Sequence, residues 1–421
     1  MKILVIGSGA REHALARALD RDPSTHEVVV APGNPGTAGI AVNRDVDPLD
    51  PAAVSALAVE LGADLVVVGP EAPLVAGVAD AVRAVGIPCF GPDAEAARLE
   101  GSKAFAKEVM AAAEVPTALA HVCTTLDDVR DALDAFGPPF VVKDDGLAAG
   151  KGVVVTEDRE AALAHAEACL ARAGEGRAVV VEEYLDGPEI SLFCLCDGTD
   201  AVPLAPAQDF KRLADGDAGP NTGGMGAYSP LPWAPEGLVE EVMERVARPV
   251  VREMARRGTP FTGVLYCGLA LTSRGLRVIE FNARFGDPET QVVLARLASP
   301  LAELLLAAAT GRLGQALEPR WSKEAAVTVV LASSGYPEDV RTGDRIEGVA
   351  QAEALDGVDV LHAGTGLDVD GALVSAGGRV LSVVGTGADQ AAARRAAYAG
   401  VDRITLAGSQ HRRDIAAEHE G

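Results

Sequence analysis

The sequence predicts a multidomain α/β protein that opens with a doubly wound parallel sheet. The chain has 421 residues, which exceeds one ordinary domain and indicates two to four. In its first hundred residues, short apolar runs ending in glycine or proline alternate with stretches of helical spacing, which is the rhythm of strands and crossover helices. The pattern changes near Gly101 and again near Ala325, so two further α+β regions are expected.

The expected elements of the first region are strands at 3–6, 28–30, 65–68 and 87–90, and helices at 11–20, 52–61 and 78–85. Strands connected by helices pair in parallel, and the loops at their carboxyl ends form a crevice where ligands bind. We therefore expect a ligand site at the ends of these strands.

The second region is predicted to hold strands at 140–143, 152–155, 178–181 and 277–281, with helices at 161–170 and 238–254. Pro249 should kink the second of these helices, because it lacks an N–H and its ring crowds the preceding turn. Residues 209–230 read as a long loop rich in glycine and proline. The third region is expected to contain strands at 327–331, 358–361 and 380–384 and a helix at 389–400.

Composition excludes several classes of protein. The formal net charge is −24, so the chain repels nucleic acid and anionic membrane surfaces at long range. There is no signal peptide and no apolar run of 18 residues, so a cytoplasmic, soluble protein is expected. The six cysteines are scattered without a C-x-x-C pair, which favours buried free thiols in a reducing compartment.

Lysine is rare, and its placement is informative. Only 7 of the 37 basic residues are lysine, and five of these lie in or beside the motifs described below: Lys103, Lys107, Lys143, Lys151 and Lys211. A compact ammonium and a planar guanidinium are not interchangeable at a phosphate, so this distribution favours phosphate binding. Chance clustering is the alternative.

The turn Gly7-Ser8-Gly9 follows the first strand and opens a helix. It partly matches the dinucleotide-binding fingerprint G-x-G-x-x-G. Glu12 occupies the position of the third glycine, and this mismatch disfavours binding of NAD or FAD. A glycine turn at a helix N-terminus can still seat a single phosphate, and Arg11 would add positive charge there. The alternative is a tight turn without a ligand.

A second glycine-rich loop runs from Lys143 to Gly152. It is not a Walker loop, because only three residues separate Gly146 from Gly150 and because it joins two strands. Its backbone N–H groups can nevertheless fold over phosphates, with a lysine at each end. A plain hairpin turn is the alternative.

The strand at 277–281 runs into Asn282 and then Arg284. A strand period of two places Glu280 and Asn282 on one face, where both offer the hard oxygen ligands that suit Mg²⁺. Arg284 follows and could reach a transferring phosphoryl group. The alternative is a half-exposed edge strand.

Two further segments have functional and structural interpretations. The strand that ends in Glu182-Glu183 leads into an acidic turn up to Glu189, which could serve a purine edge and a ribose or be only a solvated turn. Residues 221–227 form a glycine nest inside the long loop, and loops of that length are usually functional or disordered. We favour a substrate or phosphate loop.

Several motifs follow one another in a fixed order: GSGAREHALA, APGNPGTA, VGPEAPLVAGVAD, LEGSKAFAK, DGLAAGKGV, EEYLDGPEIS, GPNTGGMGAYSP, GVLYCGL, EFNARFGDPETQ, GYP and HAGT. On these motifs the chain closely resembles the phosphoribosylamine–glycine ligase family (glycinamide ribonucleotide synthetases) of purine biosynthesis. The resemblance spans essentially the whole chain. The runs 220–230 and 280–291 are the most specific to that family.

The resemblance implies a division into domains. It implies an N-terminal doubly wound domain over 1–101, a central ATP-grasp domain over 102–324 with a mobile lid at about 120–187, and a C-terminal domain over 325–421. It also implies the reaction: ATP, glycine and 5-phosphoribosylamine give glycinamide ribonucleotide, ADP and phosphate through glycyl phosphate. Partners would be these small molecules only, with no nucleic acid and no membrane, and the enzyme would be a monomer.

The resemblance also assigns residues. Those expected to bind ATP are Lys103, Lys143, Gly146, Leu147, Gly150, Lys151, Gly152, Glu182, Glu183, Leu185 and Glu189. Those expected to hold phosphoribosylamine and glycine are Gly9, Arg11, Glu12, Asn221, Thr222, Gly223, Gly224, Met225 and Gly226. Glu280 and Asn282 would ligate Mg²⁺ or Mn²⁺, and the residues expected to be catalytic are Arg284, Asp287 and Lys211.

One position departs from the family pattern. The family usually has Lys-Ala-Asp-Gly where this chain has Lys143-Asp144-Asp145-Gly146. Asp144 adds a negative charge near the expected phosphates, but alternation along the strand points its side chain away from that of Lys143. Two other classes remain open: another ATP-grasp carboxylate–amine ligase, and a silent nucleotide-binding sensor.

Overall fold

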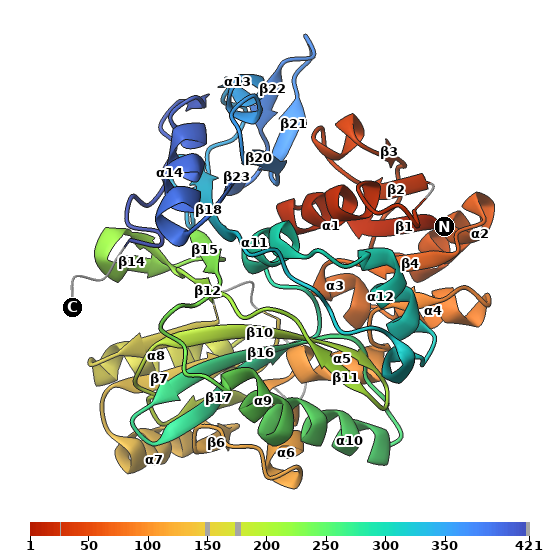
Figure 1. The fold of residues 1–421 in the computed structure, drawn as a ribbon. Coiled ribbons are helices and arrows are strands. Elements are labelled where there is room, and N and C mark those ends of the chain that lie inside the picture. Colours follow the sequence, from red (N-terminus) through yellow and green to blue (C-terminus); the bar gives the residue numbers. More distant parts are fainter. Residues whose placement is uncertain (26, 148–151, 173–177, 418–421) are drawn as a thin grey trace.

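The computed structural model describes residues 1–25, 27–147, 152–172 and 178–417. The elements build four larger sheets, arranged in Figure 1 with the N-terminal part at the upper right, the C-terminal part at the upper left and the central parts below. The predicted class is confirmed: a parallel α/β region is followed by antiparallel α+β regions.

The N-terminal sheet is fully parallel, with the order β3-β2-β1-β4-β5. Its strands are β1 (Lys2–Gly7), β2 (Glu27–Pro32), β3 (Val42–Asn43), β4 (Leu65–Val68) and β5 (Cys89–Phe90). Its helices are α1 (Ala10–Asp20), α2 (Pro51–Leu61), α3 (Glu71–Val75) and α4 (Val78–Ala84). The chain leaves β1 in one direction and returns to its other side as β4, so a switch point lies between the ends of these strands.

A separate antiparallel sheet, ordered β6-β9-β7-β8, forms what we call the lid. It consists of β6 (Ala120–Cys123), β7 (Phe140–Asp144), β8 (Val153–Thr156) and β9 (Val179–Glu182), together with α7 (Leu126–Phe136) and α8 (Arg159–Leu170). The lid has an apolar core of its own, centred on Val129, Val142 and Val181. It therefore packs as a unit distinct from the rest of the chain.

The central sheet is antiparallel, with the order β11-β10-β16-β17. Its strands are β10 (Glu189–Asp197), β11 (Ala201–Pro203), β16 (Thr262–Thr272) and β17 (Gly275–Asn282), and its helices include α5 (Ala94–Gly101) and α6 (Lys103–Ala112). The predicted helix 238–254 consists of α9 (Leu238–Val242), a π turn (Met243–Ala247) and α10 (Arg248–Arg256). A π turn therefore interrupts the predicted helix just before Pro249, and the predicted kink at Pro249 stays a prediction.

The fourth sheet, ordered β12-β15-β18-β23-β20, joins distant parts of the chain. It contains β12 (Gln208–Asp209), β15 (Gly226–Ser229), β18 (Ala325–Ala332), β20 (Val358–His362) and β23 (Arg379–Gly387), covered by α14 (Gln390–Val401). Helix α11 (Glu289–Arg296) packs against this sheet and against α1, and α12 (Leu301–Ala309) follows it. The domain limits expected from the sequence stay predictions.

The prediction of a structureless loop at 209–230 is wrong. That segment contains β12, a small ladder of β13 (Arg212–Ala214) and β14 (Ala218–Asn221), and β15. Such strands are two to four residues long and are rich in glycine and proline, so no alternation marks them in the sequence. The remaining short elements are β19 (Ile346–Glu347), β21 (Thr365–Leu367), β22 (Leu373–Ser375), β24 (Thr405–Leu406) and α13 (Val349–Glu353).

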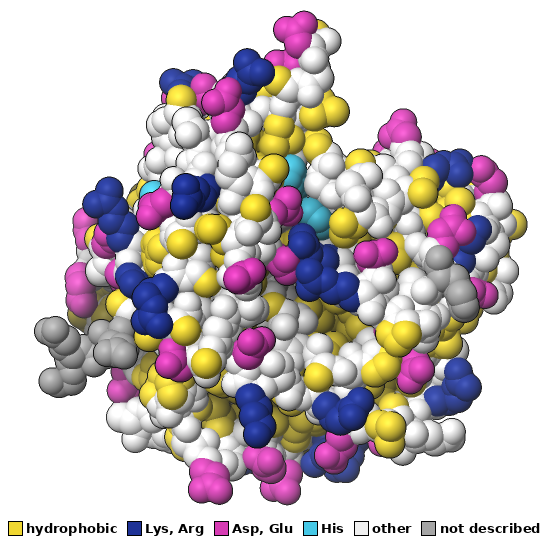
Figure 2. All heavy atoms as spheres, turned by 45° about the horizontal axis from the view of Figure 1, so that its top comes forward, with side chains coloured by type: hydrophobic (Ala, Val, Ile, Leu, Met, Phe, Trp, Pro, Cys, Tyr) yellow, Lys and Arg dark blue, Asp and Glu magenta, His cyan; other side chains and the backbone are white. Residues whose placement is uncertain are grey.

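The burial of the cysteines agrees with the expectation from composition. All six cysteines are buried free thiols, as predicted. None of the helices in the described ranges is long and apolar enough to cross a membrane. On the face drawn in Figure 2, acidic and basic side chains are interspersed.

Candidate functional site

The turn between β1 and α1 is built around Glu12. The Glu12 carboxylate accepts a hydrogen bond from the Gly9 N–H at 2.7 Å and pairs with Arg11 Nε at 2.5 Å. A Cβ built on Gly69, at the end of β4, would lie 2.0 Å from Glu12 Oε1. Glu12 therefore fills the crevice at the switch point, which is why glycine stands at Gly7, Gly9 and Gly69 around it.

This turn reaches toward the loop that precedes α11. Arg11 Nη1 donates to the Phe285 carbonyl at 3.1 Å, and Arg11 is only 7% exposed. A Cβ on Gly9 would lie 3.8 Å from Asp287 Oδ2. The structure thus brings the predicted residues Gly9, Arg11 and Asp287 together from segments far apart in the sequence.

The Asn221–Gly226 loop meets the same place from another side. Thr222 donates from both its N–H and its hydroxyl to the Lys211 carbonyl, each at 2.8 Å. Gly224 has φ +108°, and a Cβ there would lie 2.4 Å from Pro288 Cδ, so only glycine lets the loop rest on that proline. Met225 and Gly226 are buried and anchor the loop in the sheet.

Asp287 is the point where these segments converge. Its Oδ1 accepts from Gln291 Nε2 at 2.8 Å and lies 3.4 Å from Arg379 Nη1. Burial would raise the pKa of Asp287, but Arg379 and Arg11 outweigh it, so the pKa is lowered and the carboxylate stays charged. Arg379 comes from β23 and was not predicted as a site residue.

Glu280 and Asn282 lie side by side on β17, as the alternation predicted. Neither side chain makes a hydrogen bond or ion pair within the described parts of the chain. Burial would raise the pKa of Glu280, but the cations Lys211, Lys143, Lys103 and Arg284 together lower it. An ionised carboxylate and an amide oxygen without other partners fit a hard divalent cation.

These two ligands are few for a metal site made only of protein. The described residues contain no cluster of three or more His, Cys, Asp or Glu side chains that could hold a metal. Mg²⁺ usually binds one or two carboxylates and completes its octahedron with water and substrate phosphates. The pair Glu280 and Asn282 is therefore suited to a cation that arrives with a phosphate ligand.

Arg284 is held by two carboxylates. Its Nε lies 3.2 Å from Glu71 Oε2, and its Nη2 lies 3.0 Å from Glu100 Oε1. Its Nη1 donates to the Phe285 carbonyl. Although burial alone would lower it, the pKa of Arg284 is raised by these acids, so the predicted cation stays charged at a fixed position.

Lys211 joins a partly exposed polar cluster beside Glu280. Its ammonium pairs with Glu189, and acidic neighbours, including Glu189 and Asp209, hold its pKa well above the ordinary range despite partial burial. Burial raises the pKa of Asp209 to about 7, with Lys211 opposing. The Glu189 carboxylate, expected at a ribose, is therefore engaged with Lys211.

Next to that pair lies a buried group of three hydrogen-bonded side chains, Ser191, Tyr266 and Glu289, which the sequence analysis missed. Ser191 Oγ and Tyr266 OH each hydrogen-bond Glu289 Oε1, at 3.0 and 2.8 Å, and they lie 2.8 Å from each other. Alternation on β10 places Ser191 on the same face as Glu189, which is the signal that could have found it.

The predicted ATP residues line the junction between the lid and the core. Lys103 Nζ donates to the Gly146 carbonyl at 3.0 Å. Lys143 is 4% exposed, and its Nζ donates to the Ile279 carbonyl at 3.0 Å, next to Glu280. Leu147 is half exposed, Gly152 is buried, and Gly150 and Lys151 lie outside the described residues.

The acidic turn after β9 uses its carboxylates within the protein. Both oxygens of Glu182 contact lysines, Lys107 at 3.0 Å and Lys143 at 2.8 Å. Glu183 accepts from the Leu119 N–H and pairs with Arg274 at 2.8 Å. Leu185 is half-buried. An adenine at this turn would therefore meet backbone groups rather than these two carboxylates.

Asp144 lies on the opposite face of β7 from Lys143, as the alternation predicted. It is 1% exposed, and its Oδ2 lies 2.6 Å from Arg172 Nη1, beyond the end of α8. The negative charge that departs from the family pattern is thus compensated inside the lid.

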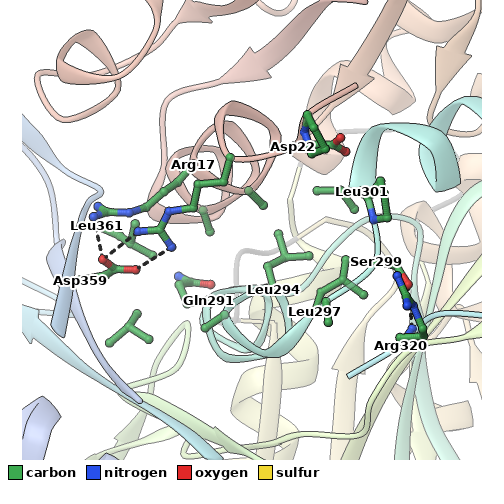
Figure 3. A pocket seen from close by; sticks show the side chains of 18 residues that line it. Arg17, Asp22, Gln291, Leu294, Leu297, Ser299, Leu301, Arg320, Asp359 and Leu361 are labelled. Atoms are coloured by element: carbon green, nitrogen blue, oxygen red, sulfur yellow. Dashed lines mark hydrogen bonds and ion pairs between the residues drawn. The ribbon is translucent and has the colours of Figure 1, made fainter. Parts of the chain in front are cut away.

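A cavity of about 400 Å³ lies elsewhere, between α1, α11 and the fourth sheet. None of the predicted site residues lines it, and Figure 3 shows Arg17 and Asp359 joined on its wall beside Gln291 and Leu294. Arg17 and Arg21 both pair with Asp359 there. The predicted site residues gather instead at the lid junction and at Asp287.

A lid sheet with a lysine at its glycine loop, set over an antiparallel sheet that presents Glu280 and Asn282, defines a protein of the ATP-grasp class. Three family models of phosphoribosylglycinamide synthetase match the chain: the N domain over residues 1–100, the ATP-grasp (A) domain over 101–290 and the C domain over 326–418. The chain belongs to this family, and the resemblance seen in the motifs is confirmed.

Individual relatives agree. A phosphoribosylamine–glycine ligase from Streptomyces coelicolor is 67% identical over 424 residues and covers 100% of both chains. The crystal structure of a phosphoribosylamine–glycine ligase from Thermotoga maritima matches with a TM-score of 0.84 at 32% identity, over 99% of this chain and 100% of that one. The fold alone is shared with the biotin carboxylase domain of Hydrogenobacter thermophilus 2-oxoglutarate carboxylase, solved with MgADP, at a TM-score of 0.74 and 18% identity over 97% and 91% of the chains.

Proposed function

We propose that this chain ligates glycine to 5-phosphoribosylamine at the expense of ATP, giving glycinamide ribonucleotide, ADP and phosphate. The observation that carries the proposal is the convergence on Asp287 of the Gly9 turn and the Gly224 loop. Next to it lies a strand with two side-chain oxygen groups, Glu280 and Asn282, that make no hydrogen bond or close ion pair among the described residues. An acid, an amine and ATP must meet at one point in such a ligation, and this geometry supports such a meeting point.

In the first step, a carboxylate oxygen of glycine attacks the γ-phosphorus of ATP, and the bond from that phosphorus to ADP breaks. Positioning and charge neutralisation supply most of the catalysis of phosphoryl transfer. Lys103, Lys143 and Lys211 lie close enough to Glu280 to lower the pKa of its carboxyl group, so they are placed to face the phosphates of an ATP bound there. A bound Mg²⁺ or Mn²⁺, held by Glu280 and Asn282, would supply further charge neutralisation at the phosphates.

In the second step, the amine nitrogen of phosphoribosylamine attacks the carbonyl carbon of glycyl phosphate, phosphate leaves with its oxygen, and the amine loses a proton. Asp287 suits this amine, because its pKa is lowered and a charged carboxylate orients an N–H donor. Arg284 suits the acyl phosphate as a fixed guanidinium. We assign Gly9, Arg11, Glu12 and the Asn221–Gly226 loop to phosphoribosylamine and glycine.

An isotope experiment tests the intermediate. Glycine labelled with ¹⁸O in its carboxylate should pass one labelled oxygen to the released phosphate, and ADP should form only when both glycine and phosphoribosylamine are present. Unlabelled phosphate with normal product formation would exclude glycyl phosphate. Release of AMP and pyrophosphate would point to an adenylate, and ADP release with a different acid or amine would indicate another ligase of the class.

We propose further that the enzyme works as a cytoplasmic monomer. Light scattering in solution should give the mass of one chain, 43.1 kDa. A mass of twice that value would overturn the monomer.

A further inference from the structure

A buried ion triad joins the lid to the core. Glu182, at the end of β9, contacts Lys107 Nζ through Oε1 at 3.0 Å and Lys143 Nζ through Oε2 at 2.8 Å. The three side chains are only 12%, 5% and 4% exposed for Lys107, Lys143 and Glu182. Lys143 and Glu182 belong to the lid, whereas Lys107 belongs to α6 in the core.

The two lysines differ in how many oxygen atoms surround the ammonium group. An ammonium has three N–H donors. Lys107 Nζ has three oxygen neighbours: it donates to Thr117 Oγ1 at 2.9 Å and to the Ala118 carbonyl at 3.0 Å, and it forms an ion pair with Glu182 at 3.0 Å. Lys143 Nζ has two oxygen neighbours in the described parts of the chain: it donates to the Ile279 carbonyl at 3.0 Å and forms an ion pair with Glu182 at 2.8 Å. Of these two lysines, Lys143 is therefore the one whose third N–H faces no oxygen of the described residues.

The partners of the triad fix its place relative to the metal strand. Thr117, which accepts from Lys107, donates in turn to the Val278 carbonyl at 2.7 Å. Ile279, which accepts from Lys143, is the next residue on β17 and directly precedes Glu280. Both lysines are therefore hydrogen-bonded, directly or through Thr117, to the strand that carries Glu280 and Asn282, and each contacts a different oxygen of the Glu182 carboxylate.

The charge of the triad is also informative. Two ammoniums and one carboxylate give it a net charge of +1, and Lys143 also acts on the ionised Glu280 carboxylate. Burial, with Lys143 as neighbour, lowers the pKa of Lys107 against the opposing effect of Glu182. When a divalent cation binds Glu280, a phosphate next to the remaining Lys143 N–H would balance the positive charge of the triad.

We propose that Glu182 and Lys107 are positioning residues for ATP: Lys107 holds the Glu182 carboxylate from the core, and Glu182 aims the remaining N–H of Lys143 at a phosphate. This inference rests on the proposed function and deepens it. It gives the Glu182 side chain a role that differs from an adenine contact. It also gives a task to Lys107, whose ammonium already has three oxygen neighbours within the protein.

The first test is Glu182→Gln in the full-length protein. Losing the shared charge leaves two ammoniums facing an amide, so the KM for ATP should rise about tenfold or more while the KM for glycine changes less than about twofold. The melting temperature should fall as well, because two buried ammoniums lose their counter-charge, so both KM values are measured well below the melting transition of the variant. The matched control is Asp134→Asn, which removes a carboxylate from an exposed ion pair of the lid, Asp134 with Arg159, and should leave both KM values unchanged.

The second test is a double-mutant cycle with Lys107→Met and Lys143→Met, measured by titration with a non-hydrolysable ATP analogue. If Lys107 acts only through Glu182 and Lys143, its substitution weakens binding in the parent protein and has no effect in the Lys143→Met background. Additive effects would mean that Lys107 binds ATP independently and would overturn the proposal. An unchanged KM for ATP in Glu182→Gln would overturn it as well.

These outcomes are separable from those of the proposed function. If the parent protein binds the ATP analogue and forms ADP with glycine and phosphoribosylamine while Glu182→Gln behaves like the parent, only the positioning role fails. If the parent protein does not bind the analogue, the ligase function itself fails, and with it the role of the triad.

Discussion

Arg379 Nη1, on β23 of the fourth sheet, donates to the main-chain oxygen of Asp287 at 2.8 Å. The same nitrogen contacts the Gly223 carbonyl and lies 3.3 Å from the Gly224 carbonyl. The Gly223 N–H donates to Tyr336 OH at 3.0 Å, which also belongs to the C-terminal part. The C-terminal part therefore holds the glycine loop and Asp287 in one arrangement.

Replacing Arg379 by alanine should weaken the use of glycine and phosphoribosylamine more than that of ATP. The change leaves the carbonyl oxygens of Gly223, Gly224 and Asp287 without their cationic donor, and one hydrogen bond to a charged group contributes about 1.5–3 kcal/mol, or roughly tenfold or more in KM. Steady-state kinetics with each substrate varied would measure it. Arg345→Ala serves as the control, because it removes an exposed arginine of the C-terminal part that pairs with the exposed Glu347. A KM that rises only for ATP would contradict the assignment.

Glu280→Gln should nearly abolish turnover and leave the fold intact. It removes the charge from one of the two proposed metal ligands, on a strand whose buried residues Val278 and Phe281 are untouched. The circular dichroism spectrum and the melting temperature of Glu280→Gln should match those of the parent protein. The control Glu347→Gln, which changes an exposed carboxylate, should match the parent protein in turnover as well. More than about a tenth of the parental rate, a loss of only about 1.4 kcal/mol of barrier, would place the metal elsewhere.

Asp144→Ala should leave the affinity for ATP unchanged or improve it. The carboxylate lies on the face of β7 away from Lys143 and is compensated by Arg172, so its removal does not alter the phosphate side. The lid should lose roughly 1 kcal/mol of stability through the broken ion pair. Calorimetric titration with a non-hydrolysable ATP analogue and urea melts measure the two effects. A clear loss of affinity would give Asp144 a role in binding.

The interface between α1 and β20 should lose stability in acid. The His362 N–H donates to His13 Nδ1 at 2.9 Å, so His13 must be unprotonated at that atom. Burial lowers the pKa of His13 from its ordinary value of 6.5 to about 3 and that of His362 to about 4. Below pH 6.5 the unfolded chain therefore binds protons that the native chain does not, and stability falls as the pH drops through the window from 6.5 to about 4.

Urea unfolding at a series of pH values measures this effect, with a slope of at most about 1.4 kcal/mol per pH unit for each histidine. His13→Asn keeps a side-chain oxygen as acceptor for the His362 N–H and removes one titrating group, so about half of the slope should disappear. An unchanged slope in that variant would assign the acid sensitivity to other groups.

The parts of the fold that could be predicted are those in which burial requires a regular pattern of apolar residues in the sequence. The strands near Ile3, Leu65 and Val327 are continuous apolar runs because both faces are covered, and each was found within a few residues. The shared face of Glu280 and Asn282 on β17 could be predicted because side chains alternate along a strand. The lysines at the lid drew attention because lysine is scarce in this chain, and their role at ATP stays a prediction.

The parts that could not be predicted depend on contacts between distant segments. Arg379 lies 92 residues from Asp287, and nothing around it in sequence distinguishes it from other arginines. Lys107 was noted only as one of the motif lysines, because its saturation by Thr117, Ala118 and Glu182 is visible only in three dimensions. Strand β15 escaped notice because four residues beginning with glycine carry too little periodicity.

The pairing of β15 with β18 means that the chain cannot be divided cleanly at the point where its sequence character changes. Register pairs such as Ala227 with Thr328 and Tyr228 with Val327 cross residue 325. A fragment ending at 324 would present the bare edge of β15, and one beginning at 325 would present that of β18, and bare edges recruit other strands into aggregates. A chimera that takes its C-terminal part from a relative should therefore fold only when residues 208–229 come from the same relative.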